Sequence, residues 1–438
     1  MRKQTPSLLH PDHTPSLVFA DRDGVIRDFP DLNMAGRSGE SFVLPEREDL
    51  IPLPAGSELF VLPDRRPVGI DPQNGAPLLL DQDPHQPGEE IRAVAAFMAP
   101  AYTAIHVAAY QGTQQKLSPL PLFAYTAVGW YNGIFWVSAF RCDPDPRQDA
   151  DRFSRKKIRE KTRRRLKSHP ENRLIQHLGN CCLNYSCPAA KNYFLDRWEA
   201  PLPSSPTCNA NCVGCISLQP SGCCPSTQER ITFVPTPAEI SEIAVPHLRK
   251  VPRPVVSFGQ GCEGEPLLQK NTLAAGIRQI RSQTDRGTIN LNTNGSRPAS
   301  VEELAHAGLD SMRVSLNSAR TEYHHRYYRP KDFSLSNVIA SIDIMKKENR
   351  FVSLNYFILP GFTDDPDEFT ALCDLIDNHR PDLIQLRNLN MDPEWYLRVV
   401  DHRPGKQALG IRHWLSLLQK LFPQLRFGYF NPALQVSE

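Results

Sequence analysis

From about residue 199 onward, short apolar runs alternate with longer stretches of helical character. This alternation is typical of repeated strand–helix units, whose strands lie side by side in a parallel sheet. We expect strands at 255–258, 288–292, 311–316, 352–358 and 383–386, and helices at 238–250, 267–283, 300–307, 334–349 and 365–378. A first strand is expected just before residue 208. The pattern therefore predicts an α/β fold, a partial (β/α)6-type barrel over residues 199–390.

The first part of the chain has another pattern. Residues 1–146 contain short runs rich in aromatic and β-branched residues between Pro, Gly and Asp clusters, as strands and turns do. Residues 130–136 predict a hairpin with Asn132-Gly133 at its turn. Residues 92–110 predict a helix that Pro100 interrupts. We expect a β-rich N-terminal domain that handles substrate.

The remaining boundaries follow from changes in composition. Residues 147–198 are expected to form a basic linker helix and a cysteine-containing connector. The barrel at 199–390 is followed by a C-terminal helix and strand extension at 391–438, with the helix at about 406–421 and the strand near 425–430.

Composition excludes several classes of protein. Hydrophobic residues make up 40% of the 438 residues and charged residues 22%, as in a globular protein. The sequence has no apolar run of about 18 residues, and its first residues lack the apolar stretch of a secretory signal. We therefore expect a cytoplasmic protein with no membrane partner. In that compartment 11 cysteines favour metal, cluster or redox use over disulfides.

Three of these cysteines, Cys208, Cys212 and Cys215, fall within eight residues. A loop of this length can turn all three sulfurs toward one point. Three thiolates on one iron–sulfur cluster leave one iron without a protein ligand, and that position is open to chemistry. The alternatives are a zinc knuckle or chance clustering, and zinc is the less favoured occupant because it usually has a fourth ligand nearby.

More cysteines lie in the same window of the sequence. An additional metal site or a second iron–sulfur cluster would draw on two groups, Cys181, Cys182 and Cys187, and Cys223 and Cys224. Adjacent cysteines cannot easily bind the same metal, so the alternative is that these are free thiols around the cluster pocket. Cys262 could be a substrate-side thiol, a neighbour of the cluster or a buried residue.

Residues 152–167 combine ten cations with only one acidic residue, Glu160, and contain no Gly or Pro. This composition predicts a helix. Such a helix is either a solvated linker or a surface that binds RNA or another polyanion through its phosphates. No RNA-binding signature with stacking aromatics accompanies the run, so nucleic acid is not the favoured partner.

Over residues 199–390 the sequence resembles the radical S-adenosylmethionine (SAM) superfamily. The resemblance rests on five fragments in the expected order: Cys208-x3-Cys212-x2-Cys215, Phe258-Gly-Gln-Gly-Cys-Glu-Gly-Glu-Pro266, Leu291-Asn-Thr-Asn-Gly295, Arg313-Val-Ser-Leu-Asn-Ser318 and Leu359-Pro-Gly-Phe-Thr-Asp364. Each follows or ends an expected strand, where the active residues of parallel barrels lie.

The resemblance implies a mechanism and its cofactors. Cys208, Cys212 and Cys215 would bind a [4Fe-4S] cluster whose fourth iron chelates SAM. After one-electron reduction by flavodoxin or ferredoxin, SAM is cleaved to methionine and a 5′-deoxyadenosyl radical, which takes hydrogen from a substrate. Such an enzyme is oxygen-sensitive. The residues expected to contact SAM are Gly261, Glu263, Gly264, Glu265, Asn294, Ser315 and Asn317.

Two departures from the family pattern bear on this site. Gly214 stands where an aromatic residue often precedes the third cysteine. The glutamate motif is lengthened by Cys262 and Glu263, which leaves open which residue meets the SAM amine.

The substrate is expected to be a peptide, a protein or a small molecule. The alternatives are an RNA-modifying enzyme or RNA-binding protein that uses the basic helix, and a non-catalytic zinc or iron–sulfur scaffold. The lack of cysteines after Cys373 argues against an auxiliary cluster in a C-terminal extension.

Overall fold

The computed structural model describes residues 13–114, 117–219 and 224–434. The chain divides into two compact units, and each is described by itself. Unit 1 comprises residues 1–144, 357–370 and 387–421, and unit 2 comprises residues 145–356, 371–386 and 422–438. The expected division into 1–146, 147–198, 199–390 and 391–438 stays a prediction.

Unit 2 is built on a seven-stranded sheet whose strands follow one another in chain order. The strands are β15 (Glu199–Pro201), β16 (Val255–Phe258), β17 (Thr288–Thr293), β18 (Ser311–Leu316), β19 (Phe351–Ile358), β20 (Leu383–Asn388) and β21 (Arg426–Gly428). The pairs from β15 to β19 and the pair β20–β21 are parallel. This sheet confirms the predicted α/β fold with a partial barrel.

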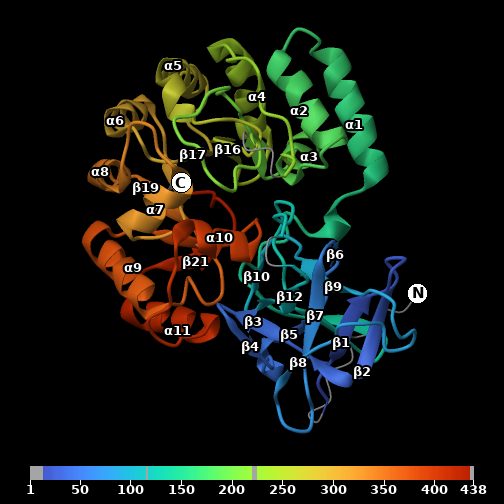
Figure 1. Ribbon diagram of the computed structural model, residues 1–438. Helices are drawn as coiled ribbons and strands as arrows, with labels where there is room; N and C mark the ends of the chain where they lie inside the picture. The colour runs from blue at the N-terminus through green and yellow to red at the C-terminus, as the bar shows by residue number, and fades with distance from the viewer. Residues whose placement is uncertain (1–12, 115–116, 220–223, 435–438) are drawn as a thin grey trace. The chain divides into compact units, whose positions relative to one another are not determined.

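Helices connect these strands and cover the outer side of the sheet (Figure 1). They are α4 (Pro237–Lys250), α5 (Lys270–Arg281), α6 (Pro298–Ala307), α7 (Thr321–Tyr328), α8 (Leu335–Lys347) and α9 (Pro366–His379). Thr236 and Glu239 form a capping box at the start of α4, and the helix continues through Pro246. Gly308 ends α6 in the left-handed conformation, at φ 113°. The sequence did not predict α7.

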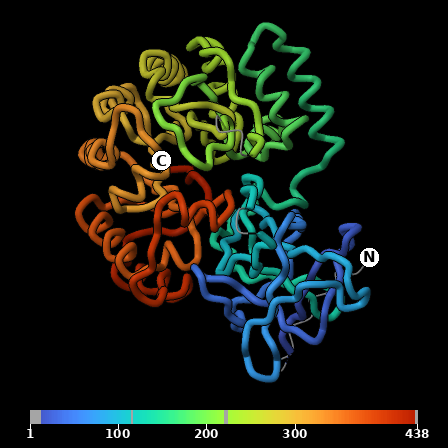
Figure 2. Tube along the Cα trace, in the orientation of Figure 1, coloured from blue at the N-terminus to red at the C-terminus, as the bar shows by residue number. Residues whose placement is uncertain are grey.

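Three further helices precede the barrel in unit 2, and Figure 2 follows the Cα trace from them into the sheet. They are α1 (Arg155–Ser168), α2 (Arg173–Leu183) and α3 (Pro188–Phe194). Ser154 caps α1 and Asn172 caps α2 by accepting a backbone N–H bond in the first turn. The predicted basic helix is therefore confirmed as α1, while α2 and α3 form the cysteine-containing connector.

Unit 1 contains an antiparallel β-structure, which confirms the predicted strand-rich N-terminal region. Its strands are β1 (Ser16–Ala20), β2 (Ile26–Met34), β3 (Gly36–Ser38), β4 (Ser41–Val43), β5 (Leu50–Pro52), β6 (Glu58–Leu62), β7 (Arg65–Ile70), β8 (Pro77–Leu79), β9 (Arg92–Phe97), β10 (Tyr102–Ala104), β11 (Val107–Ala108), β12 (Tyr110–Gly112), β13 (Val128–Tyr131) and β14 (Ile134–Arg141). Asn132 and Gly133 join β13 to β14 with φ values of 49° and 81°, as the predicted hairpin turn requires.

The helix predicted at 92–110 is wrong, because β9 to β12 occupy this segment. β9 pairs with β6 and β1 and is buried on both faces along Ala93–Ala96. A strand buried on both faces has no polar–apolar alternation, so its apolar run cannot be told from a buried helix by periodicity.

Two more helices belong to unit 1, α10 (Pro393–Val400) and α11 (Ile411–Leu421). The helix predicted at 406–421 is confirmed as α11, with a later start. Among the described residues, no helix combines the length and the hydropathy that crossing a membrane requires.

Candidate functional site

The loop that carries Cys208, Cys212 and Cys215 follows β15 and is held by backbone hydrogen bonds on two sides. On one side, Gly264 and Glu265 donate their N–H groups to the carbonyls of Ser205 and Thr207, at 2.7 and 2.8 Å. On the other, Asn211 and Val213 donate to the carbonyls of Tyr328 and Tyr327, at 2.9 and 3.0 Å. The loop after β16 and the end of α7 therefore fix the path of the cysteine loop.

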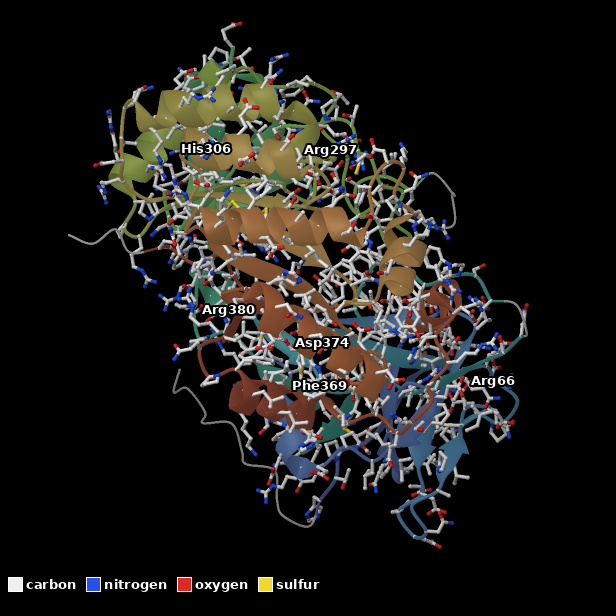
Figure 3. The ribbon with its side chains drawn as sticks, turned by 90° about the vertical axis from the view of Figure 1, so that its left-hand side faces the viewer. Arg66, Arg297, His306, Phe369, Asp374 and Arg380 are labelled. Carbon is white, nitrogen blue, oxygen red and sulfur yellow. The ribbon has the colours of Figure 1, made fainter. Side chains whose placement is uncertain are left out.

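Polar side chains connect the same loop to the end of β17. Asn209 donates to Ser296 Oγ and to Asp332 Oδ1, each at 3.0 Å, and accepts from Asn294 Nδ2 at 3.0 Å. Arg297, labelled at the start of α6 in Figure 3, pairs with Asp332. The loops that follow β15, β16, β17 and β18 are thus joined at the carboxyl ends of the parallel strands, where barrel enzymes place their active residues.

The three thiols are partly buried. Burial raises the pKa of Cys208 to about 11 and, with the neighbouring thiols, raises that of Cys212 as well. Among the described residues, their sulfurs do not form a group whose members all lie within 4.8 Å of one another. In a cluster each thiolate binds a different iron, so the three sulfurs need not approach one another as closely as they would around a single ion.

Arg230 is a charged neighbour of this site that sequence reasoning missed. Its guanidinium donates to Cys215 Sγ at 3.5 Å and to Ser217 Oγ at 3.1 Å. Ser217 Oγ in turn donates to the carbonyl of Glu263 at 3.2 Å. A cation at this position stabilises negative charge on the Cys215 sulfur. No spacing rule would have found Arg230, because it lies 15 residues beyond Cys215 in the sequence and meets it only through the fold.

The two glutamates predicted to contact SAM are buried and already bonded to the protein. Glu263 accepts the N–H groups of Ser204, Ser205 and Gln260 and the hydroxyl of Ser204, at 2.6 to 3.0 Å. Burial raises its pKa to about 7. Its carboxylate therefore ties the start of the cysteine loop to the loop after β16.

Glu265 plays a similar part toward β17. It accepts the Thr293 hydroxyl and the N–H groups of Leu267 and Asn294, the latter two at 3.0 and 2.8 Å. Burial raises its pKa to about 6. Together the two carboxylates organise the loops around the predicted site, and contact of either with SAM stays a prediction.

The predicted glycines lie where backbones approach closely. A Cβ on Gly264 would lie 1.9 Å from the carbonyl oxygen of Thr207, and one on Gly261 would lie 2.4 Å from Gln228 Nε2. The Gly264 contact is with backbone, which cannot turn away as a side chain can. Gly264 is therefore required for the cysteine loop to lie against the loop after β16.

We expect Gly264→Ala to displace the cysteine loop, because the added methyl group overlaps the Thr207 carbonyl. Overpacking of this kind costs about 1–3 kcal/mol in the free energy of unfolding. The variant should also bind less iron on reconstitution, as measured by iron content per chain. Gly405→Ala is the matched control, since a Cβ there meets no atom within 4 Å. Equal iron content in both variants would contradict this account.

The remaining predicted SAM contacts lie on β17 and β18 or just beyond them. Asn294 bonds to Asn209, as described above. Ser315 is half-buried near the end of β18 and lies opposite Asn355 of β19. Asn317 is fully buried and donates to the carbonyl of Tyr323 at 3.1 Å. Their contacts with SAM stay predictions.

The fragment 359–364 belongs to unit 1, where it packs against the N-terminal strands. Gly39 donates its N–H to the carbonyl of Pro360 at 3.0 Å, and Gly361 has φ 86°. Asp364 accepts the N–H groups of Gly361 and Gly410 at 2.6 and 2.8 Å. This turn is therefore formed by contacts within unit 1.

The cysteines considered for an auxiliary site have different surroundings. Cys181 Sγ lies 3.6 Å from His177 Nε2, whereas Cys182 Sγ lies 3.5 Å from Thr162 Oγ1 of α1. The Cys187 N–H donates to the carbonyl of Cys181 at 3.0 Å, and Cys224 is buried. Cys223 lies outside the described residues. The adjacent residues Cys181 and Cys182 therefore contact different side chains, His177 and Thr162.

A hydrogen bond links Cys181 to Cys262. The bond from Cys262 and the neighbouring His177 lower the pKa of Cys181 to about 5 against the opposing effect of burial. The same bond and burial raise the pKa of Cys262. One of the two thiols therefore ionises far more readily than the other.

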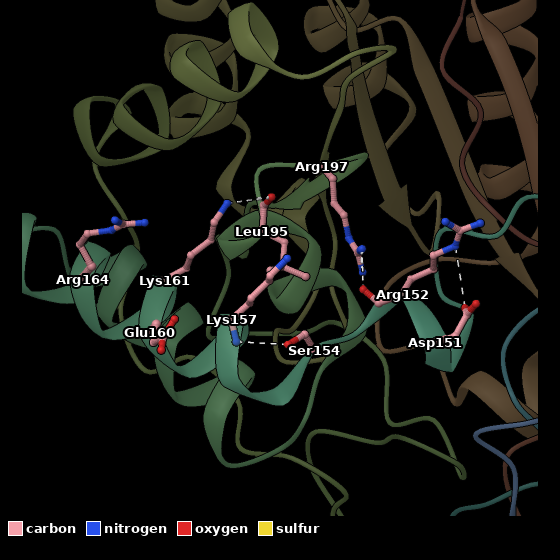
Figure 4. Close-up of a pocket in the computed structure, with 9 residues that line it drawn as sticks. All are labelled: Asp151, Arg152, Ser154, Lys157, Glu160, Lys161, Arg164, Leu195 and Arg197. Atoms are coloured by element: carbon pink, nitrogen blue, oxygen red, sulfur yellow. Dashed lines mark hydrogen bonds and ion pairs between the residues drawn. The ribbon is translucent and has the colours of Figure 1, made fainter. Parts of the chain in front are cut away.

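The basic helix α1 borders a surface pocket of about 700 Å³. Figure 4 shows its lining residues, Asp151, Arg152, Ser154, Lys157, Glu160, Lys161, Arg164, Leu195 and Arg197. Lys161 is held by Asp196 at 3.1 Å, and Arg197 donates to the carbonyl of Arg152 at 2.7 Å. Burial and the charge of Arg152 lower the pKa of Arg197 to about 10. The lining is mainly cationic, although Lys161 and Arg197 already form hydrogen bonds within the protein.

Comparison with known proteins identifies the family of the barrel. Residues 202–373 match the model of the radical SAM superfamily. No curated protein matches the sequence. Similar solved structures include a radical SAM methyltransferase from Sphaerobacter thermophilus, with 14% identity and a TM-score of 0.38 over 54% of this chain and 66% of that one.

Two others are methylornithine synthase and the Streptococcus suis protein SuiB bound to the precursor peptide SuiA. The first has 15% identity and a TM-score of 0.38 over 56% of this chain and 68% of that one. The second has 14% identity and a TM-score of 0.38 over 59% of this chain and 53% of that one. The matched residues, which contain the cysteine loop and the parallel strands β16 to β19, are thus identified as a radical SAM domain.

Proposed function

We propose that the chain cleaves SAM reductively at a [4Fe-4S] cluster bound by Cys208, Cys212 and Cys215, and that the resulting 5′-deoxyadenosyl radical takes hydrogen from a peptide, protein or small molecule. One observation carries this proposal. Within the matched residues, hydrogen bonds join the loops after β15, β16, β17 and β18 around the cysteine loop.

The donor set fits the cluster. Three thiols on one loop can each bind one iron and leave the fourth iron free for SAM. Cluster binding displaces the protons of these buried thiols. Arg230 stabilises the negative charge that remains on Cys215.

The contacts of the two glutamates bear on how SAM is held. Both carboxylates are occupied by hydrogen bonds within the protein. We therefore propose that Glu263 and Glu265 shape the site and that their carboxylates do not contact SAM directly. The backbone edge of residues 259–265 then faces the SAM amino group. Asn294, Ser315 and Asn317 would supply polar contacts for the ribose and the methionine carboxylate. A flavodoxin or ferredoxin would supply the electron.

Anaerobic reconstitution with iron and sulfide tests this function. We expect a brown protein that forms 5′-deoxyadenosine from SAM after reduction with dithionite, detected by chromatography. A colourless protein that carries zinc at the Cys208 loop and forms no 5′-deoxyadenosine would instead support the non-catalytic scaffold.

A second candidate function is action on RNA, and the pocket beside α1 favours it. Lys157 and Arg164 are exposed and line that pocket, so both could reach phosphates. Each phosphate contact contributes about 0.7 (single strand) to 0.9 (duplex) to the slope of log affinity against log salt concentration.

If RNA is bound there, Lys157→Glu with Arg164→Glu should reduce that slope by about 1.4–1.8. The measurement is RNA binding by fluorescence anisotropy across a series of salt concentrations. Lys347→Glu with Lys420→Glu is the control, because both lysines are exposed and lie outside the pocket. Equal slopes for the two double variants would exclude the pocket as an RNA site.

A further inference from the structure

Three metal-binding side chains converge at a point away from the Cys208 loop. His177 and Cys181 are four residues apart on α2, so they lie on one face of the helix. Cys262 reaches the same point from the loop after β16. Their ligand atoms all lie within 4.8 Å of one another, and the described residues contain no other such group of at least three.

The distance between His177 Nε2 and Cys181 Sγ equals the separation expected for two ligands of one zinc ion. Zinc–nitrogen bonds of about 2.0–2.1 Å and zinc–sulfur bonds of about 2.3 Å at a tetrahedral angle separate nitrogen from sulfur by about 3.5–3.6 Å. His177 Nε2 and Cys181 Sγ are 3.6 Å apart. The pair is therefore spaced for one tetrahedral ion with no rearrangement of α2.

We propose that His177, Cys181 and Cys262 bind a single zinc ion, with the fourth position open to water or another ligand. This site is distinct from the proposed [4Fe-4S] site and does not depend on the proposed SAM chemistry. Binding would release the remaining protons of the two thiols, so that both sulfurs coordinate as thiolates.

Two observations favour one ion over a second iron–sulfur cluster. Each thiolate of a cluster binds its own iron, which needs wider spacing than is found here, where all three ligand atoms lie within 4.8 Å of one another. In addition, Cys182 cannot complete the set, because its sulfur lies against Thr162. The proposed ligands therefore differ from the predicted auxiliary group. They include Cys181 but not Cys182, and they add His177 and Cys262.

The position of Cys262 suggests what the ion does. Cys262 directly precedes Glu263, whose carboxylate holds the start of the cysteine loop. The carbonyl of Cys262 also accepts the N–H of Ile231 at 2.8 Å. A metal at this point would link α2 to the loop after β16 and so help to fix the path of the Cys208 loop.

Metal analysis of the full-length chain tests the proposal. The parent protein carries Cys208→Ala, Cys212→Ala and Cys215→Ala, so that the predicted [4Fe-4S] ligands are absent. We expect about one zinc per chain by mass spectrometry in this parent and at least a tenfold lower content after His177→Ala or Cys181→Ser. Cobalt in place of zinc should give thiolate charge-transfer absorption that disappears in the same variants.

Matched variants separate loss of a ligand from loss of folding. Cys182→Ser alters an equally buried neighbour that faces Thr162, and it should keep its zinc. His177→Cys supplies another zinc ligand and should also keep it. Absence of zinc from a folded parent, a Cys181–Cys262 disulfide in place of metal, or equal loss in Cys182→Ser would each overturn the proposal. Because the parent lacks the Cys208 triplet, none of these results depends on SAM cleavage.

Discussion

Replacing Cys208, Cys212 and Cys215 together by alanine is expected to remove about four irons per chain and to reduce 5′-deoxyadenosine formation to background. The physical reason is that each sulfur would bind a different iron of the proposed cluster, so the loop would lose all three protein ligands at once. The measurements are iron and sulfide content after anaerobic reconstitution, and chromatography of the products of SAM. The largest functional effect should therefore follow from these three atoms.

Cys142→Ala with Cys373→Ala is the matched control, because these cysteines lie outside the predicted cluster loop. This variant should keep its iron and its SAM cleavage. In the triple variant, about four residual irons would mean a second [4Fe-4S] cluster and would contradict a mononuclear auxiliary site. Full SAM cleavage by the triple variant would overturn the assignment of the cluster ligands.

The largest effect on stability is expected at a buried ion pair in unit 1. Asp392 and Arg65 lie 2.7 Å apart, and their side chains are 2% and 3% exposed. Asp392 also accepts the N–H groups of Leu120, Glu394 and Trp395. Asp392→Ala would leave the Arg65 charge buried without its carboxylate and α10 without its cap, which should lower the free energy of unfolding by about 3–5 kcal/mol.

Urea unfolding followed by tryptophan fluorescence measures this loss, and hydrogen exchange near Leu120 and at the start of α10 locates it. Because chains of more than one domain need not unfold in a single step, the comparison uses the transition that reports on unit 1. Lys406→Ala removes an exposed partner of Asp367 and should change stability by less than about 1 kcal/mol. An Asp392→Ala variant as stable as Lys406→Ala would refute the prediction.

Local patterns in the sequence were sufficient to predict most strands and helices of the barrel. Strands 311–316 and 352–358 were predicted almost to the residue, because apolar and polar residues alternate along them, as is typical of a strand. The hairpin at Asn132-Gly133 and the capped helix α1 are also local, since turn and cap preferences act within a few residues. The segment 92–110 failed because burial of both faces of β9 removes the alternation that would identify a strand.

The sequence by itself determined the parallel barrel, the strand-rich N-terminal region and the Cys208-x3-Cys212-x2-Cys215 loop, because each depends on neighbours along the chain. Only the tertiary structure decided the rest of the site. Arg230 reaches Cys215, and Cys262 meets His177 and Cys181, through the folding of loops whose paths no spacing specifies. The two glutamates were visible as a motif, but their burial and bonds within the protein depend on how the loops after β15, β16 and β17 pack together.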